Sequence, residues 1–422
     1  MEKIYKKIID DKMNIFLIVS LLGTILFFIW LIVSGDSQPF KWLVMEHNYD
    51  WQFSDFFRQI VYSSDLKNIY FNTSDVPFPP LAYIFFHLIY RLNPTIYNID
   101  LFQWQNAELY QYNLLIFLMI ELVNVLLLYH IIKKHLGKYS NKKVLAFVIS
   151  ILLSAPFFAG VLERGNPALI TLTLILYSLY YKDSKNKKMR QISLILLAIA
   201  SGFKIYPAIL IILWIKEKRY EEVKRFLIYC LIFVILPFAF TGGINGFIKY
   251  SENLFTNFRV IVINTWTSIE PFGYALSQTL NLGFNPLVTT IIKYLFLILG
   301  ITLAFITKEK KKALIPLATL MAVFVTLSYR YVAIYMIIPL IYFLKDNCDK
   351  NPKINILYVV LFGLIFTIPV LAFMFEVDFA IFVIIYIVNI FFIIESIYNL
   401  IKNNKRKSQT FVWQTFIFMI YY

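Results

Sequence analysis

A polar, aromatic-rich stretch at residues 47–81 lies between two apolar segments and contains four aspartates. Asp55 occurs near its start, in the sequence SDFF, where Ser54 is suitably placed to be the N-cap of a helix. A carboxylate within about 3 Å of a sugar hydroxyl can take its proton as the oxygen attacks an anomeric carbon. Asp55 is therefore a candidate general base, or else only a first-turn residue favoured by the helix dipole. Asp50 comes near it if the segment between them is a loop.

Four cations suit the binding of a phosphate group, and they are Lys204, Arg330, Arg164 and Arg259. A cation beside the oxygen that joins a sugar to a phosphate stabilises the negative charge that develops as the sugar leaves. Arginine offers a bidentate fork, and lysine offers a point charge. Structural alternatives exist, because arginines at membrane depth can snorkel to the interface and Glu163 can pair with Arg164 or Lys204.

Other chemistries lack their motifs. The chain has no GxxxxGK[ST] phosphate loop, no GxSxG nucleophile elbow and no HExxH zinc motif. Its two scattered cysteines, Cys230 and Cys348, form neither a disulfide framework nor a metal-binding spacing. We expect no cofactor and predict no metal site, although Asp50 and a second aspartate have the ligand type to share a divalent ion.

The composition is that of a membrane protein. Of the 422 residues 59% are hydrophobic, and the mean hydropathy is +0.68, whereas soluble domains rarely exceed about half apolar residues. Many apolar runs approach the ~20 residues that cross a bilayer, which predicts roughly 11–13 membrane helices. We expect an all-α, polytopic integral membrane protein that forms a single domain over residues 1–422 in the cell membrane.

The net charge of +15 comes largely from lysine clusters between apolar runs, a pattern that orients helices in a bilayer. Such clusters attract anionic lipid headgroups, so we expect membrane lipid and not nucleic acid as a partner. The charge rule places the amino terminus in the cytoplasm and predicts outer loops at about 34–76 and 242–286. Residues 77–92 conflict with this rule unless they are re-entrant or juxtamembrane.

Further along, residues 144–162 are expected to cross outward as one helix. Residues 192–203 and 205–215 are each too short to span. We expect a broken or tilted hairpin with Lys204 recessed into the membrane, which is tolerated where the backbone is buried in protein or lines a cavity. The charge rule then gathers seven polar residues at or near outer ends, namely Asp55, Glu163, Arg164, Asn166, Lys204, Arg259 and Arg330.

Six short motifs resemble, in order and spacing, those of glycosyltransferase family 87 within the GT-C superfamily. The first three are Asp-Phe at 55–56, Ile-Tyr at 69–70 and FPPL at 78–81, where family members usually have Tyr-Pro-Pro-Leu. RGNP at 164–167 resembles a Gly-X-Asn step that opens a helix, and GFKIYP at 202–207 fits a Lys-X-Tyr/X-Pro step. SYRY at 328–331 is a looser match, with arginine where histidine is common.

The resemblance implies a GT-C-like helix bundle. It also implies an enzyme that moves a hexose or pentose from a polyprenyl-phosphate sugar to a lipid-linked or cell-wall glycan on the extracytoplasmic side. The family name suggests mannose, which the sequence itself does not show. A retaining reaction needs a second carboxylate nearby, and none is obvious, so we expect inversion. Asp55 is then the general base. We expect Lys204, Arg330 and Arg164 to bind the donor phosphate. The residues expected to contact substrate are Asp50, Glu163, Asn166, Tyr206 and Arg259.

Two other function classes fit a polytopic chain. A transporter or lipid flippase predicts similarly interrupted helices in two halves around a midplane site, and the sequence has no matching halves. A glycan polymerase or ligase of similar topology also uses outer loops with arginines, so it is the closer rival. The aromatic outer segments suit sugar stacking or, alternatively, an interfacial aromatic belt.

Overall fold

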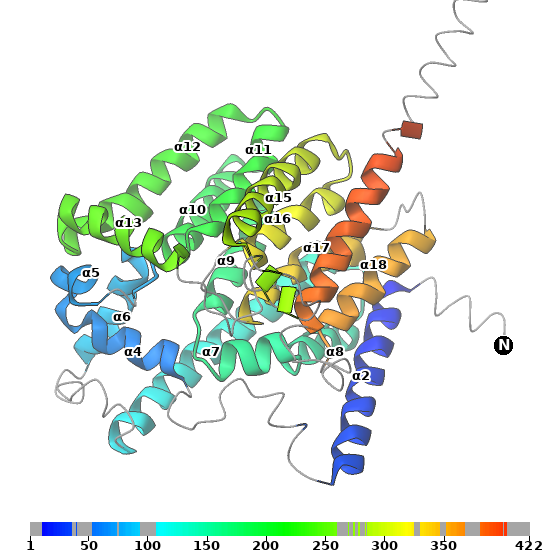
Figure 1. Cartoon of the computed structure of the whole chain (residues 1–422), viewed down its shortest axis with the longest axis horizontal. Coiled ribbons are helices and arrows are strands. Elements are labelled where there is room, and N and C mark those ends of the chain that lie inside the picture. Colours follow the sequence, from blue (N-terminus) through cyan, green and yellow to red (C-terminus); the bar gives the residue numbers. More distant parts are fainter. Residues whose placement is uncertain are drawn as a thin grey trace, which may run out of the picture.

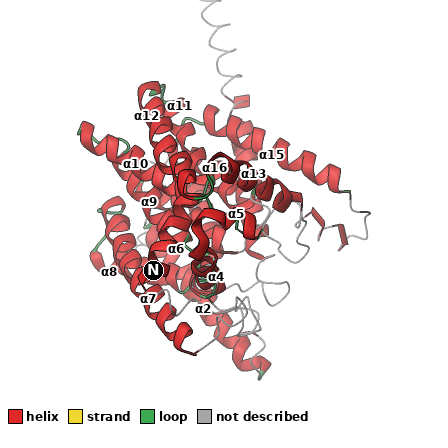
Figure 2. Cartoon of the chain, turned by 90° about the vertical axis from the view of Figure 1, so that its left-hand side faces the viewer, coloured by secondary structure: helices red, strands yellow, loops and turns green. Residues whose placement is uncertain are grey.

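The computed structural model of the chain describes residues 11–35, 53–73, 76–92, 107–259, 285–324, 330–346, 352–367 and 380–399, with isolated positions at 39, 269, 273–274, 277–278, 283 and 401–402. Within these ranges the secondary structure is helical, and no strand occurs (Figure 2). Helices satisfy the backbone polar groups of a membrane chain within each segment. The predicted all-α class is confirmed.

In the described part of the chain, five helices are long and apolar enough to cross a membrane, namely Lys12–Ser34, Gln111–His135, Tyr220–Phe240, Leu287–Ile306 and Ala380–Asn399. The bent pair Asn141–Leu152 and Pro156–Leu162 makes a sixth span if it is counted as one. Four shorter apolar helices accompany them, namely Pro80–Leu92, Ala168–Tyr181, Tyr206–Lys216 and Lys353–Ile365. The chain is thus a multi-pass membrane protein.

The elements are labelled in chain order (Figure 1). The first group is α2 (Lys12–Ser34), α4 (Ser54–Tyr62), η2 (Ser63–Asn68), α5 (Ile69–Asn72), α6 (Pro80–Leu92), α7 (Ala107–His135), α8 (Asn141–Leu152), η5 (Pro156–Leu162), α9 (Ala168–Tyr181) and α10 (Lys187–Phe203). The second group is η6 (Tyr206–Ile211), α11 (Ile212–Lys216), α12 (Tyr220–Cys230), η7 (Leu231–Ile235), η8 (Leu236–Phe240), α13 (Gly243–Arg259), α15 (Pro286–Ile306), α16 (Lys310–Val323), η9 (Arg330–Met336), α17 (Ile337–Lys345) and α18 (Pro352–Ile365).

Two membrane segments differ from the sequence prediction. Residues 144–162 form a broken span and not one helix, because α8 ends at Leu152 and the π-helix η5 starts at Pro156 after a bend of 58°. Proline lacks an N–H group and clashes with the preceding turn, so it interrupts an α-helix. The helix before Lys204 begins at Lys187 and not at residue 192, which makes α10 17 residues long. The arm after Lys204, formed by η6 and α11, is as short as predicted.

Helix α6 covers most of the segment whose crossing was in doubt. It is 13 residues long, and a helix of that length measures about 20 Å, short of the ~30 Å hydrocarbon core. It contacts α4, η2, α10 and η8. This length and packing favour the re-entrant or juxtamembrane alternative.

The centre of the bundle is built from short helices and not from the long apolar ones. Buried side chains make up most of α9, all of α16 after Lys310, all of η9 and the apolar part of α17. The long helices α2, α7 and α15 instead present many exposed leucine and isoleucine side chains. Between α9 and α10, the Ser193 hydroxyl donates to the Ser178 carbonyl at 2.7 Å. The long helices therefore offer the apolar outer surface that a bilayer requires.

The two ends of this bundle carry different chemistry. At one end, α4, α5 and α6 lie together with α13, at the left edge of Figure 1. Their aromatic residues form one buried cluster with Phe117 of α7 and Phe203 of α10. At the other end, the turn after α9 is joined to the turn before α12 by ion pairs, such as that of Arg219 with Asp183 at 3.0 Å. Since α10 has 17 residues, its rise separates the two ends by about 25 Å.

Candidate active site

The start of α4 is docked on the turn between η5 and α9. The N–H group of Phe53 donates to the carbonyl of Glu163 at 2.6 Å, and that of Asp55 donates to the carbonyl of Arg164 at 2.8 Å. Gly165 has a φ of +67°, and a Cβ added there would lie 2.8 Å from Cβ of Phe56. Glycine is thus required both by the left-handed backbone and by this close approach.

The predicted N-cap role of Ser54 is wrong. Helix α4 is preceded by Phe53 in the left-handed region, with a φ of 56° and no side-chain cap. Ser54 itself is the first residue of the helix, and its hydroxyl is buried with no hydrogen-bond partner among the described residues. Ser54 does not cap α4 because backbone hydrogen bonds from Phe53 and Asp55 to the turn after η5 fix the start of the helix.

The Asp55 carboxylate is held by two side chains of that same turn. Arg164 Nη2 donates to Oδ1 at 3.0 Å, and Asn166 Nδ2 donates to Oδ2 at 2.7 Å. The Asp55 side chain is 14% exposed, and that of Arg164 is 4% exposed. A carboxylate has about four acceptor positions, so each oxygen keeps capacity for a further donor.

Asn166 connects this carboxylate to the central helix. Its Oδ1 accepts a hydrogen bond from the N–H group of Ala168, the first residue of α9, at 3.1 Å. The side chain is 1% exposed. One amide group therefore satisfies a backbone donor at the start of α9 and orients Asp55 at the same time.

Lys204 is buried beside this group, at the C-cap of α10. Its Nζ lies 4.7 Å from the ring centre of Phe78 and 4.6 Å from that of Tyr331, which are cation–π distances. Asp55 is close enough to interact electrostatically with it. Within the described part of the chain, Lys204 makes no hydrogen bond or ion pair. The donor capacity of its ammonium group is thus unused.

The Phe78 ring is positioned by buried tyrosines. Tyr70 donates its hydroxyl to the Phe78 carbonyl at 3.0 Å, and the Phe78 N–H group lies 3.5 Å from the Tyr83 hydroxyl. Asn253 of α13 donates to the Tyr70 carbonyl at 2.9 Å. The Ile-Tyr and FPPL motifs therefore share a structural task, which is to hold an aromatic face against Lys204.

The Tyr331 ring is positioned by a close helix contact. A Cβ added to Gly160 of η5 would lie 2.7 Å from the backbone nitrogen of Tyr331 and 3.1 Å from Cγ of Arg330. Arg330 is 5% exposed and directly precedes Tyr331 in η9. The absence of a side chain at Gly160 thus lets η9 approach η5 beside Lys204.

The remaining predicted residues are placed differently. Tyr206 lies 3.0 Å from Tyr335, hydroxyl to hydroxyl, and so makes a contact within the protein. Glu163 contributes its backbone carbonyl to the docking of α4. Arg259 is the last residue of α13, but its side chain lies outside the described residues, as does the whole of Asp50.

Several buried ionisable residues were not considered in the sequence prediction, and two of them lie in long apolar helices that contact or flank the bundle. Glu121 in α7 is 4% exposed, and Lys293 in α15 is 5% exposed. Glu121 lies about one helical turn from Phe117, whose ring is 5.2 Å from that of Phe56, centre to centre. The signal that identifies such residues is a single charge inside an apolar run, whereas our prediction considered only charges near the outer ends.

The described residues contain no group of three or more histidines, cysteines, aspartates or glutamates with metal-binding geometry. What they bring together is an oriented carboxylate, an arginine and an amide on one side, and a buried lysine between two rings on the other. Chemically, such a site can accept a proton from a hydroxyl group and bind an anion.

Comparison with known proteins identifies one family. A model of glycosyltransferase family 87 matches residues 78–337, which is more than half of the chain. The matched region includes Phe78, Arg164, Asn166, Lys204 and Tyr331, whereas Asp55 precedes it. No curated protein matches the chain.

Proposed function

Because the chain belongs to glycosyltransferase family 87 and is therefore a membrane glycosyltransferase, we propose that it uses a polyprenyl-phosphate sugar as its donor. The sugar is a hexose or pentose, and the acceptor is a lipid-linked or cell-wall glycan. The reaction takes place on the extracytoplasmic side and inverts the anomeric carbon. The proposal depends on one observation: the oriented Asp55 carboxylate is close enough to interact electrostatically with the ammonium group of Lys204, which forms no ion pair with any described residue.

In this proposal Asp55 is the general base. An acceptor hydroxyl transfers its proton to the carboxylate while its oxygen forms a bond to the anomeric carbon. The bond between that carbon and the phosphate oxygen breaks, and polyprenyl phosphate leaves with the electron pair. Arg164 and Asn166 support this role because they fix both carboxylate oxygens and leave acceptor positions for the incoming hydroxyl.

Lys204 binds the donor phosphate. A buried ammonium group is costly unless an anion or hydrogen-bond acceptors compensate for its lost hydration, and the rings of Phe78 and Tyr331 supply only part of that compensation. A phosphate in this position would satisfy the charge and would gain stabilisation as negative charge develops on the leaving oxygen. Arg330 is the second candidate for binding the donor phosphate. Arg164 is paired with Asp55, so we assign it to positioning the base.

The assignment to the extracytoplasmic side is supported by charge. The lysine-rich turns lie at the opposite end of α10 from Lys204, and such clusters are typical of cytoplasmic loops. Tagging of the turn at residues 182–186 for accessibility in intact cells tests this side. Labelling of that turn from outside the cell would contradict it.

The catalytic assignment is tested with purified protein and polyprenyl-phosphate sugars that carry a radiolabel. Asp55→Asn keeps the size of the side chain and removes the base, so transfer should fall by about 10²–10⁴-fold. Asp65→Asn is the matched control, because Asp65 belongs to the same region but is exposed, and its hydrogen-bond donors among the described residues are the nearby Asn68 and Asn72. Substrate uptake into proteoliposomes without transfer would favour a transporter instead.

A further inference from the structure

A pocket of about 340 Å³ lies at the lysine-rich end of the bundle, where α9, α10, α16 and α17 meet. Its wall includes Tyr180 and Tyr181 from the end of α9 and Ser184 from the turn that follows. Lys310, the first residue of α16, and Lys345, the last residue of α17, also line it, together with Asp183 and Tyr342. Because α9 has 14 residues, its rise places this pocket about 20 Å from the Asp55 site.

One carboxylate, that of Asp183, lines this pocket, and it is paired with cations of the protein. Asp183 pairs with Lys182 at 3.3 Å, with Arg219 at 3.0 Å and with Lys310. Burial raises the pKa of the Asp183 carboxyl, but the charges of Lys310 and Lys182 outweigh it and lower the pKa to about 2. Asp183 therefore stays charged under physiological conditions and is shared among three cations.

Lys345 has no such partner. Among the described residues no carboxylate forms an ion pair with it, and its Nζ lies 5.9 Å from the ring centre of Tyr342. Lys310 Nζ lies 5.4 Å from the same ring. Two ammonium groups thus flank one aromatic ring, and only one of them has an anion.

The wall of the pocket continues onto the lipid-facing surface. The ring of Tyr181 lies 6.2 Å from that of Tyr177, centre to centre, in a stacked arrangement. The Tyr177 hydroxyl donates to the carbonyl of Leu127 in α7 at 3.4 Å. Leu126 and Leu122 of the same helix are 60% and 61% exposed. Tyrosines between a polar pocket and an apolar surface are typical of the headgroup level of a membrane.

We propose that this pocket binds the phosphate of an anionic phospholipid, whose acyl chains lie against the apolar face of α7. Lys345 and Lys310 contact the phosphate, and the hydroxyl of Ser184 is available to donate to it. Basic pockets between membrane helices recognise lipid headgroups in this way. This site is separate from the transfer reaction and does not depend on the proposed donor.

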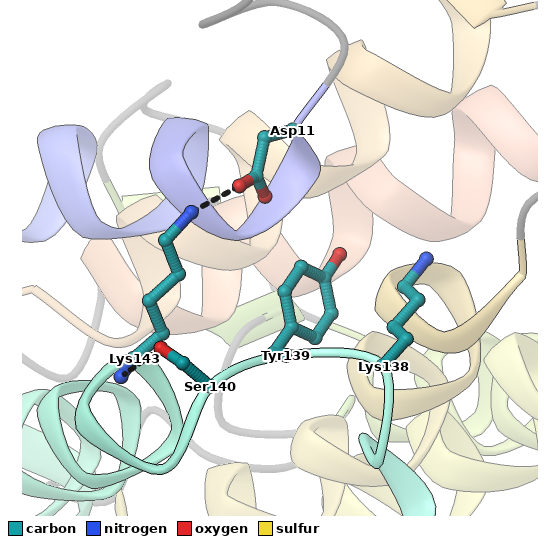
Figure 3. A pocket seen from close by; sticks show the side chains of 5 residues that line it. All are labelled: Asp11, Lys138, Tyr139, Ser140 and Lys143. Carbon is teal, nitrogen blue, oxygen red and sulfur yellow. Dashed lines mark hydrogen bonds and ion pairs between the residues drawn. The ribbon is translucent and has the colours of Figure 1, made fainter.

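A second pocket at the same end provides the control (Figure 3). It is lined by Asp11, Lys138, Tyr139, Ser140 and Lys143. Figure 3 shows the Asp11 carboxylate directed at Lys143, with which it forms an ion pair, and Lys138 on the other side of Tyr139. Lys143 is paired here as Lys310 is in the first pocket, but only one ammonium group lies over the Tyr139 ring, that of Lys138 at 4.9 Å, whereas two lie over Tyr342. This pocket is therefore the weaker candidate for an anion.

The experiment uses full-length protein purified in a neutral detergent. Its unfolding temperature is followed while phosphatidylglycerol, phosphatidylcholine or inorganic phosphate is added. We expect phosphatidylglycerol to raise the unfolding temperature more than either of the others. One lysine near a headgroup contributes roughly a five-fold change in affinity, so Lys345→Gln should weaken the apparent affinity for phosphatidylglycerol about five-fold, and Lys345→Arg should restore it.

Lys138→Gln removes the same charge from the same end of the molecule and should leave the affinity for phosphatidylglycerol unchanged. Because Lys345 is exposed, its substitution should not prevent folding. Equal losses in Lys138→Gln and Lys345→Gln would show a diffuse basic surface and no site. An equal response to inorganic phosphate would show a free-anion site, and an equal response to phosphatidylcholine would show that charge is irrelevant. Each of these results would overturn the proposal.

Discussion

Asn166 tests how the base is oriented, because its Nδ2 donates to Asp55 and its Oδ1 accepts from the N–H group of Ala168. Asn166→Ala removes both the donor to Asp55 and the acceptor for the N–H group of Ala168. The loss of a helix cap and of a hydrogen bond to a charged group should lower the free energy of unfolding by about 2–4 kcal/mol. A carboxylate that is free to rotate should also lower the transfer rate by roughly 10²-fold.

Asn166→Asp separates the two functions of the side chain. The new carboxylate still accepts from Ala168, so the start of α9 stays capped, but it faces Asp55 with a like charge in place of a donor. Two unit charges about 4 Å apart repel by about 4 kcal/mol at an effective dielectric constant of 20. Arg164 offsets part of this repulsion. Removing the proton that the two carboxylates share should therefore require a pH one to two units higher than a single carboxylate would need, at about 1.4 kcal/mol per pH unit.

The assay is the pH dependence of sugar transfer by the purified variants, with thermal unfolding measured alongside. Asn166→Asp should be more stable than Asn166→Ala, and its transfer activity should recover as the pH is raised. Asn166→Ala should lose activity by a similar factor at every pH. If both variants keep the pH profile of the unmodified protein and lose activity only in proportion to stability, Asn166 is merely structural and the reasoning about Asp55 is wrong.

Three further predictions follow from other contacts. Lys204→Met should raise KM for the donor about 10–100-fold, the value of one charge-assisted hydrogen bond, while Lys204→Arg keeps part of the affinity; an unchanged donor KM would exclude the phosphate role. Gly160→Ala should destabilise the fold by about 1–3 kcal/mol through overpacking against η9, whereas Gly137→Ala, whose nearest neighbour atom is at 3.8 Å, should be neutral by thermal unfolding. Burial raises the pKa of the Asp183 carboxyl, but the charge of Lys310 outweighs it and lowers the pKa to about 2. The stabilising charge is therefore present above about pH 4 and is lost as the pH falls through 2, so Asp183→Asn should be less stable than the unmodified protein at pH 7, and the difference should shrink as the pH falls to 2 and below.

The predicted site was chosen from polar residues near the ends of apolar runs. Asp55, Arg164, Asn166 and Lys204 stood out as polar residues near the ends of apolar runs, and the structure brings these four side chains into one neighbourhood. The sequence alone could not assign the hydrogen-bond and ion-pair partners of these side chains. We predicted Arg164 as a phosphate ligand, but the docking of α4 on the turn after η5 pairs it with Asp55, and that docking depends on tertiary backbone contacts.

The misplaced boundaries have a similar cause. Residues 144–162 are apolar throughout, so hydropathy alone could not locate the break, although Pro156 and Gly160 marked it. Tyr206 was predicted to contact substrate because it belongs to the motif at residues 202–207. The structure adds a contact between its hydroxyl and that of Tyr335, a partner 129 residues away. Contacts of that range are not encoded in local periodicity.

The most direct test of the whole account is a single comparison, in which purified protein transfers labelled sugar from a polyprenyl-phosphate donor. We predict that Asp55→Asn loses at least about 10²-fold in turnover with donor binding intact, as expected for a lost general base, while Asp65→Asn retains full activity. Transfer by Asp55→Asn at an undiminished rate would contradict the assignment of this carboxylate as the base.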